Sequence, residues 1–314
     1  MAAWRRGGVA AWRNEKHHYQ WQATLEVAHA VVGDRSVAST TTGDVTAVLE
    51  PIWRTKTETA KRKRGRIEAV LDYATAQGWR SGENPARWRG HLSNILPPPR
   101  RIARAEHHAA LPWAEIAAFM TELRAHSGVA ALALEFTILT AARTGETLGA
   151  IWPEVDLDAA LWIVPDERMK VGREHRMPLS PAAIGVLCGV LPLRVAGVGD
   201  WVFPGGRAGK GLSNMSMNRL LRRMGHGDLT VHGFRSTFRN WCAEATAHPR
   251  EVDEQALAHT LPDKVEAAYR RGDLLEKQRR LMDEWAAFCT TPNMRSIIIV
   301  RNDEADPLDL TRTP

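Results

Sequence analysis

The chain has 314 residues, of which 44% are hydrophobic and 25% charged, so wholesale disorder is excluded and about two domains are expected. No apolar run approaches the ~18 residues that cross a bilayer, and no signal-peptide pattern opens the sequence, so membrane and secreted proteins are excluded and a cytoplasmic protein is expected. The net charge of +6 is unevenly placed: residues 1–110 hold 18 Lys and Arg against 10 Asp and Glu, whereas residues 111–314 hold 24 against 26. This asymmetry predicts two segments with different functions, the first suited to a polyanion.

Apolar residues at helical spacing predict three helices in the first segment. The first ends at Gly33, the second covers 43–54, and the third begins with Thr55 and Glu58 at capping-box spacing and ends at Gly78. A basic run lies on the third helix and comprises Lys61, Arg62, Lys63, Arg64 and Arg66. Such a run is either a solvated face or a face that contacts phosphates, and the charge of the whole segment favours the second interpretation.

The proline-rich stretch at 97–101 predicts a stiff linker and a domain boundary between residues 100 and 101. Beyond it the pattern predicts helices over 113–124 and 129–142, two short strands at 161–164 and 175–179, and helices from about 181 to 289. The predicted fold class is therefore mainly α with a small antiparallel β-sheet. We expect residues 1–11 and an atypical tail at 291–314 to be disordered.

An arginine continues the inward apolar stripe of the helix predicted over 129–142. Leu132, Phe136 and Leu139 form this stripe, and Arg143 is its next position. A guanidinium there is costly unless it is paired or faces an anion. Arg143 therefore either forms an ion pair with Glu146 or binds an anion at the inner end of the helix.

Two further groups of residues allow a structural and a functional interpretation. His232 and Arg235 share a face near the start of a predicted helix, as a capping histidine and a surface arginine, or as a proton carrier and a phosphate ligand. Lys170 lies in the turn between the two predicted strands, where it is either solvated or reaches across a groove to donate a proton.

The last group pairs a histidine with a scarce tyrosine. His259 precedes Tyr269 by ten residues, and Tyr269 is followed by two arginines. Tyr269 is either a core tyrosine or a nucleophile, which would need cationic neighbours because the usual pKa of a phenol is ~10.

These residues occur in the order in which the tyrosine recombinases carry them, and the sequence resembles the integrases of prophages and genomic islands. The texts TGETL (144–148), REHRMPLS (173–180), HGFRSTFRNW (232–241) and AYRRGD (268–273) carry the resemblance, together with WRNEKHHYQWQATLE at 12–26. The resemblance covers about residues 10–290. It implies a helical, SAM-like core DNA-binding domain at 1–100 and a catalytic domain at 101–290, without the additional N-terminal domain that such integrases usually carry.

The resemblance also implies a reaction and a role for each residue. Tyr269 would attack a DNA phosphate and form a 3′-phosphotyrosyl link, which a 5′-hydroxyl later reverses. Arg143, Arg235 and His259 would hold the phosphate oxygens, Lys170 would be the general acid, His232 would move a proton, and Glu146 would orient Arg143. No cofactor or metal is expected, since the sequence has no phosphate-binding glycine loop and its three cysteines match no zinc spacing.

The expected partner is double-stranded DNA containing attachment-type sites, in the nucleoid of a bacterial cell. The family assembles homotetramers on two DNA sites, is monomeric or dimeric when free, and can use host DNA-bending or directionality factors. The helix predicted over 274–288 packs either in its own protomer or against a neighbour, and it is the candidate contact between protomers. Two alternatives to a full recombinase stay open: a truncated integrase remnant that only binds DNA, and a type IB-like topoisomerase.

Overall fold

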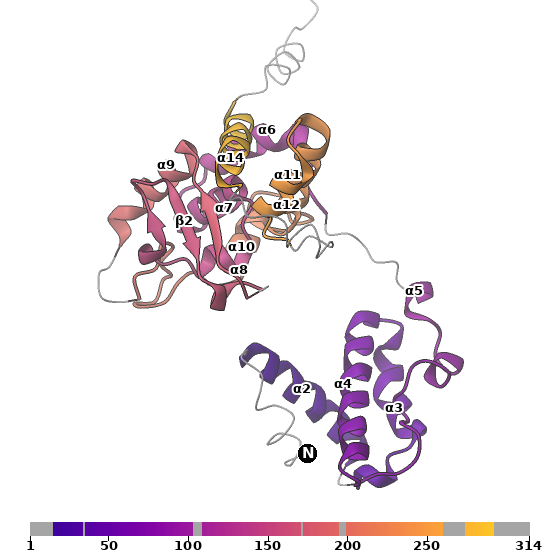
Figure 1. Ribbon diagram of the computed structural model, residues 1–314. Coiled ribbons are helices and arrows are strands. Elements are labelled where there is room, and N and C mark those ends of the chain that lie inside the picture. Colours follow the sequence, from indigo (N-terminus) through magenta and orange to yellow (C-terminus); the bar gives the residue numbers. More distant parts are fainter. Residues whose placement is uncertain are drawn as a thin grey trace, which may run out of the picture. The chain divides into compact units, whose positions relative to one another are not determined.

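The computed structural model describes residues 15–33, 35–102, 109–170, 172–194, 199–259 and 274–291. The described chain is mostly helical, with one three-stranded antiparallel sheet, so the predicted fold class is confirmed (Figure 1). The chain divides into two compact units between residues 107 and 108. The predicted linker contains a short helix, α5 (Pro99–Ile102). Its first residue is a proline, which the first turn of a helix tolerates because no hydrogen bond is lost there.

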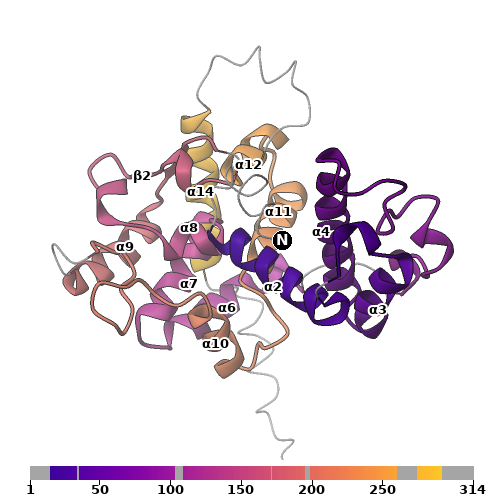
Figure 2. The same ribbon diagram turned by 90° about the horizontal axis from the view of Figure 1, so that it is seen from below.

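The first unit is built from α2 (Glu15–Val32), α3 (Thr42–Trp53) and α4 (Thr57–Ala76), with 3-10 turns at Val37–Ser39 and Leu92–Asn94. Helices α3 and α4 pack side by side (Figure 2). Their facing apolar side chains form the core of the unit, namely Val45, Val48, Leu49, Trp53, Ala60, Ile67 and Leu71.

The helix ends of this unit correct one prediction and confirm two. The capping box predicted at Thr55 is wrong: α4 begins at Thr57 without a side-chain cap, and the Thr57 hydroxyl instead donates to the carbonyl of Trp53 (2.9 Å). A capping box is present one helix earlier, at the start of α3. Gly33 and Gly78 end their helices as predicted, with φ values of +64° and +71° that favour glycine.

The second unit has eight helices and a sheet among its described residues. The helices are α6 (Ile116–Arg124), α7 (Val129–Thr140), α8 (Thr144–Leu148), α9 (Pro181–Val190), α10 (Ser216–Arg223), α11 (Gly233–Ala245) and α12 (Arg250–Ala256), and α14 (Leu275–Thr290) follows. Short 3-10 turns lie at Trp113–Glu115, Trp152–Glu154, Asp166–Arg168 and Leu191–Leu193. Helix α7 is buried on nearly all sides and contacts α6, α9, α10, α11 and α14. A helix that is apolar all round is expected at the centre of a domain.

The sheet contains the two predicted strands and one that was missed. Strands β2 (Leu161–Val164) and β3 (His175–Pro178) pair antiparallel, with Trp162 opposite Met177. The missed strand β1 (Val155–Asp156) pairs with the other edge of β2. Two residues are too few to show alternation in a sequence.

Helix α14, the candidate contact between protomers, packs against other elements of its own chain in this structure. It contacts α6, α7, α12 and β3, and its apolar residues Leu281, Met282 and Trp285 are buried there. The Trp285 indole also donates to the carbonyl of Ile138 (2.8 Å). The apolar face of this helix is therefore already occupied in cis. In the described part of the chain, no helix combines the length and apolar character needed to cross a membrane.

Candidate active site

Arg143 lies beyond helix α7, so the prediction that it continues the α7 stripe is wrong. The helix ends at Thr140, and Ala141 takes the left-handed conformation (φ +50°) that turns the chain away. Arg143 then becomes the N-cap residue of α8. This turn places the guanidinium at the surface of the core, with 22% of its side chain exposed.

The ion pair considered between Arg143 and Glu146 is present, and the backbone amide of Arg143 donates a second hydrogen bond to the same carboxylate. Glu146 Oε1 accepts from Arg143 Nη1 (2.7 Å), and Glu146 Oε2 accepts from the Arg143 amide (2.8 Å). Only 6% of the Glu146 side chain is exposed. A buried carboxylate with two bonds to one residue fixes the direction of that guanidinium.

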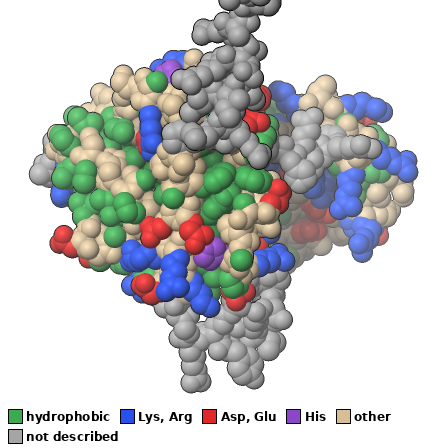
Figure 3. Space-filling model, turned by 90° about the horizontal axis from the view of Figure 1, so that it is seen from above, with side chains coloured by type: hydrophobic (Ala, Val, Ile, Leu, Met, Phe, Trp, Pro, Cys, Tyr) green, Lys and Arg blue, Asp and Glu red, His purple; other side chains and the backbone are tan. Residues whose placement is uncertain are grey.

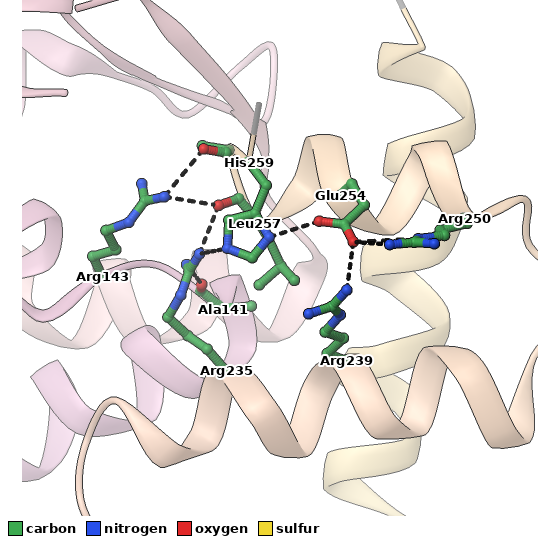
Figure 4. A network of polar contacts seen from close by, with 9 residues as sticks. Ala141, Arg143, Arg235, Arg239, Arg250, Glu254, Leu257 and His259 are labelled. Carbon is green, nitrogen blue, oxygen red and sulfur yellow. Dashed lines mark hydrogen bonds and ion pairs between the residues drawn. The ribbon is translucent and has the colours of Figure 1, made fainter. Parts of the chain in front are cut away.

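Arg235 lies near the start of α11 and is 5% exposed. Its Nη1 donates to the carbonyl of Ala141, and its Nη2 donates to the carbonyl of Leu257 (2.6 Å). The Leu257 carbonyl also accepts from Arg143 Nη2 (3.3 Å), so the two guanidinium groups meet at one oxygen (Figure 4). Residues far apart in the sequence thus form one cationic pair.

The end of α12 supplies the carbonyls that hold this pair. Leu257 is the C-cap, and Ala258 follows in the left-handed conformation (φ +49°). Its amide bonds to Gln255 (2.8 Å), and the His259 amide bonds to Glu254 (2.9 Å), which is a Schellman motif with alanine where glycine is usual. The last carbonyls of a helix carry partial negative charge, so they attract guanidinium groups. The Ala258 carbonyl accepts from Arg143 Nη2 (3.1 Å).

His259 joins the arginine pair to a buried acid. Its Nε2 lies 3.3 Å from Arg235 Nη2, and its Nδ1 lies 2.7 Å from Glu254 Oε2. Because a guanidinium can only donate, Nε2 must accept, and the proton of the neutral ring must lie on Nδ1. The partners of the ring therefore assign its tautomer.

Glu254, which was not predicted as a site residue, contacts the side chains of His259, Arg239 and Arg250. Its other oxygen, Oε1, accepts from Arg239 (2.7 Å) and lies 3.5 Å from Arg250 (Figure 4). Burial alone would raise the pKa of Glu254, but the hydrogen bond from His259 and the charge of Arg239 outweigh it and lower the pKa. The ionised carboxylate then fixes His259 from behind.

The electrostatics of the pair suit an anionic ligand. Burial lowers the pKa of Arg235 to about 10, and the nearby charge of Arg143 acts in the same direction against the opposing Glu146. Arg235 therefore stays cationic at neutral pH although its charge is poorly solvated. An anion between the two guanidinium groups would remove this cost.

A buried histidine lies near the arginine pair, on β3. His175 is 8% exposed, and its Nε2 is buried without a hydrogen-bond partner among the described residues. Burial lowers the pKa of His175 to about 4; Glu146 opposes this shift, Arg143 and Arg235 add to it, and a hydrogen bond with the backbone of Ala256 opposes it. Since Nε2 has no partner, Nδ1 is the donor in that bond, and the ring is neutral.

The depressed pKa of His175 predicts a loss of stability in acid. The unfolded chain binds this proton at the usual pKa of 6.5, whereas the folded chain binds it only near 4. The stability that depends on a neutral His175 is therefore fully present above pH 6.5. As the pH falls toward 4, the free energy of unfolding decreases by about 3 kcal/mol. The free energies of unfolding in urea of the wild type and of His175→Asn should diverge over this range, because the asparagine amide can replace the Nδ1 donor without titrating. Parallel pH profiles would show that His175 is not responsible.

Two other predicted site residues, Lys170 and His232, are exposed. Lys170 is exposed between the 3-10 turn at Asp166–Arg168 and β3, and none of the contacts described above joins it to the arginine pair. His232 is the exposed N-cap residue of α11, one turn before Arg235, so the two share the start of a helix as predicted. Tyr269 lies outside the described residues.

Sequence reasoning missed Glu254 and His175, although a signal for each was present. Glu254 stands five residues before His259, a distance that a helix end can fold into contact. His175 lies in REHRMPLS, one of the stretches that carry the family resemblance. Within the described ranges, no cluster of three or more His, Cys, Asp or Glu side chains could hold a metal ion.

Comparisons with known proteins match both units of the chain to phage integrase domains. A model of the phage integrase central domain matches residues 1–91, and a model of the phage integrase family matches residues 110–274. The chain is 32% identical over 281 residues to the prophage integrase IntZ of Escherichia coli K12, covering 88% of this chain and 67% of IntZ. It is 29% identical over 268 residues to the integrase of Enterobacteria phage P4, covering 79% of this chain and 59% of that protein.

Solved structures share the fold at low identity. A lambda integrase tetramer bound to a Holliday junction superposes with a TM-score of 0.63 at 16% identity, over 84% of this chain and 77% of that one. The Tn1549 transposon integrase in complex with transposon right end DNA gives 0.65 at 14% identity, over 97% and 98%.

Taken with the paired arginines, these matches define the class of the protein as a tyrosine site-specific recombinase. The chain belongs to the phage integrase family, and the recognition made from its motifs is confirmed. It spans about two thirds of the length of IntZ and less of the phage P4 integrase.

Proposed function

We propose that the chain cleaves and rejoins DNA strands through a covalent 3′-phosphotyrosyl intermediate, without metal or nucleotide. The observation that carries the proposal is the convergence of Arg143 and Arg235 on the end of α12, with His259 beside them. Each guanidinium has five N–H donors. Three contacts with described residues are given above for each, so donors remain for the oxygens of a phosphate.

The proposed first step follows from these positions and the family resemblance. The Tyr269 oxygen attacks the phosphorus, its proton passes toward His232, and the bond to the 5′-oxygen breaks as Lys170 protonates that oxygen. Arg143 and Arg235 stabilise the charge on the non-bridging oxygens, where each such donor contributes ~10²–10³ in rate. The reverse step, with a 5′-hydroxyl from another strand, rejoins the DNA.

His259 takes part in this step only after a change at one nitrogen. Its Nε2 accepts from Arg235 here, so donation to a phosphate oxygen needs a proton on Nε2. Glu254, bonded to Nδ1 on the other side of the ring, is placed to stabilise the resulting imidazolium. The pair would thus add a third cation when the substrate anion is present.

The general-acid role of Lys170 predicts a specific chemical rescue. The substrate is a nicked suicide duplex carrying the junction sequence that flanks the chain's own gene. Lys170→Ala should cleave it ~10²–10⁴-fold more slowly than the wild type. A duplex with sulfur at the 5′-bridging position should restore the rate, since a thiolate leaves without protonation. An equally slow reaction on both duplexes would exclude the role.

Phosphate contacts of the first unit are proposed for part of the basic run only. Arg64 bonds to Glu68 (2.6 Å) and to the Ala86 carbonyl (2.8 Å), and Arg66 bonds to the Gln20 carbonyl (2.6 Å), so both hold the unit together. Lys61 and Arg62 are more than half exposed and have only long contacts with Glu58 (3.7 and 3.3 Å). Such surface pairs are weak and leave both cations available to DNA, together with Lys63.

The triple variant Lys61→Gln, Arg62→Gln, Lys63→Gln should lower the salt dependence of DNA binding. Each phosphate contact contributes ~0.9 to the slope of log K against log salt concentration, so the slope should become shallower by about 3. Fluorescence anisotropy at several salt concentrations measures it. Arg64→Gln should instead lower the free energy of unfolding. An unchanged slope in the triple variant would remove this face from the DNA contacts.

On the face shown in Figure 3, acidic and basic side chains of the second unit lie side by side. We propose that it binds DNA through the few cations at one phosphate. A homotetramer on two DNA sites is proposed because the similar lambda integrase is seen as a tetramer on a Holliday junction. Sedimentation of the chain with and without junction DNA would test it.

A further inference from the structure

Arg168 connects the turn that carries Lys170 to the helix that carries Arg143. Its Nη1 bonds to both carboxylate oxygens of Glu154, and its Nη2 donates to the main-chain carbonyl of Glu146. The Glu154 side chain is 7% exposed, so this is a buried, bidentate pair. Glu146 therefore contacts two arginines, Arg143 through its carboxylate and Arg168 through its carbonyl.

The turn has a second fixed point between Arg168 and Lys170. Met169 is 5% exposed and belongs to the core of the second unit. The Gly172 amide donates to the Met169 carbonyl (3.0 Å), and this closes a turn around Lys170. Lys170 is thus an exposed side chain on a backbone that is held on both sides.

We propose that Arg168 is the positioning residue for Lys170: it fixes the general acid relative to the Arg143–Glu146 pair. This inference rests on the proposed function, since it assigns Arg168 an effect only through proton donation by Lys170. Lysine at 168 would keep the charge, but its single nitrogen could not hold the Glu154 carboxylate and reach the Glu146 carbonyl as well. The turn would then lose its link to α8 while the ion pair partly survives.

Gly149 offers a way to disturb the same contact without changing any charge. A Cβ on Gly149 would lie 2.8 Å from Arg168 Nη2, 3.2 Å from its Cζ and 3.0 Å from the Gly145 carbonyl oxygen. The φ of Gly149 is −96°, which alanine adopts without strain. The nearest atom belongs to the movable end of the Arg168 side chain, so we expect Gly149→Ala to displace the guanidinium from the Glu146 carbonyl.

The test compares single-turnover cleavage of the suicide duplex with oxygen and with sulfur at the 5′-bridging position. Arg168→Lys and Gly149→Ala should each cleave the oxygen duplex about tenfold or more slowly and the sulfur duplex at nearly the wild-type rate. Arg124→Lys is the matched control, because Arg124 forms another ion pair with a mostly buried acid, Glu135 (2.6 Å), between α6 and α7. Its ratio of the two rates should equal that of the wild type.

The outcomes separate the inference from the proposed function. If sulfur does not rescue Lys170→Ala, the role of Lys170 itself is wrong. If sulfur rescues Lys170→Ala but Arg168→Lys and Gly149→Ala are equally slow on both duplexes, or normal on both, Arg168 does not position the acid. Adding Arg168→Lys to Lys170→Ala should slow the oxygen reaction no further, since both changes remove one function. A further additive loss would also overturn the inference.

Discussion

Arg235→Lys is expected to slow DNA strand cleavage by ~10²–10³, with little change in DNA affinity. Arg235 uses two nitrogens to contact the Ala141 and Leu257 carbonyls and His259. A lysine ammonium has one nitrogen and cannot hold these acceptors and a phosphate oxygen together. Most of the DNA affinity comes from other phosphates, so the loss should appear in the rate. Single-turnover cleavage and anisotropy measure the two quantities.

A matched control separates this effect from a general loss of structure. Arg279 on α14 also donates from two nitrogens to backbone carbonyls, those of Ala160 (3.2 Å) and Ala159 (3.3 Å). Arg279→Lys removes a similar fork and should leave cleavage within a few-fold of the wild type. Equal losses in the two variants would mean that Arg235 acts only by stabilising the fold.

Tyr269→Phe is expected to abolish covalent adducts between the chain and DNA while DNA binding is retained. Phenylalanine fills the same space but has no oxygen to attack phosphorus, so no slower route to a phosphotyrosyl link remains. Denaturing electrophoresis of the suicide reaction gives the adduct, and anisotropy gives the affinity. Tyr73→Phe is the control tyrosine, in the first unit, and should form adducts normally. Adducts that persist in Tyr269→Phe would assign the nucleophile to another residue.

Periodicity predicted the helices well where one face is buried, and local motifs were less reliable. Apolar spacing predicted the strands at 161–164 and 175–179, and β2 and β3 occupy those places. The capping spacing at Thr55 failed because the Thr57 hydroxyl bonds to Trp53 instead. A capping motif needs the chain to enter a helix at that point, and tertiary packing decides where this happens.

The turn after α7 shows what local sequence cannot predict. Ala141 and Ala142 are good helix formers, so the stripe appeared to run on to Arg143. The chain instead leaves the helix at Ala141, whose carbonyl accepts from Arg235. This contact joins positions far apart in the sequence. No window of local sequence contains both residues.

Three members of the candidate site could be predicted from the sequence, but the residues that support them could not. The order of Arg143, Arg235 and His259 matched the family, and the structure brings these three together. The acid behind His259 and the arginine beside Lys170 have no periodic signature, because each depends on how a helix end or a turn folds. Only the structure shows that Glu254 contacts His259 and that Arg168 bonds to the Glu146 carbonyl.

The defining step of the proposed reaction is a phosphotyrosyl bond formed through Tyr269 without metal. The wild-type chain should be incubated with the suicide duplex in the presence of a chelator, and the adduct digested and mapped by mass spectrometry. We expect a nucleotide attached to the peptide containing Tyr269, through the 3′ end of the cleaved strand. No adduct on a duplex that the chain binds, or an adduct on another residue, would contradict it.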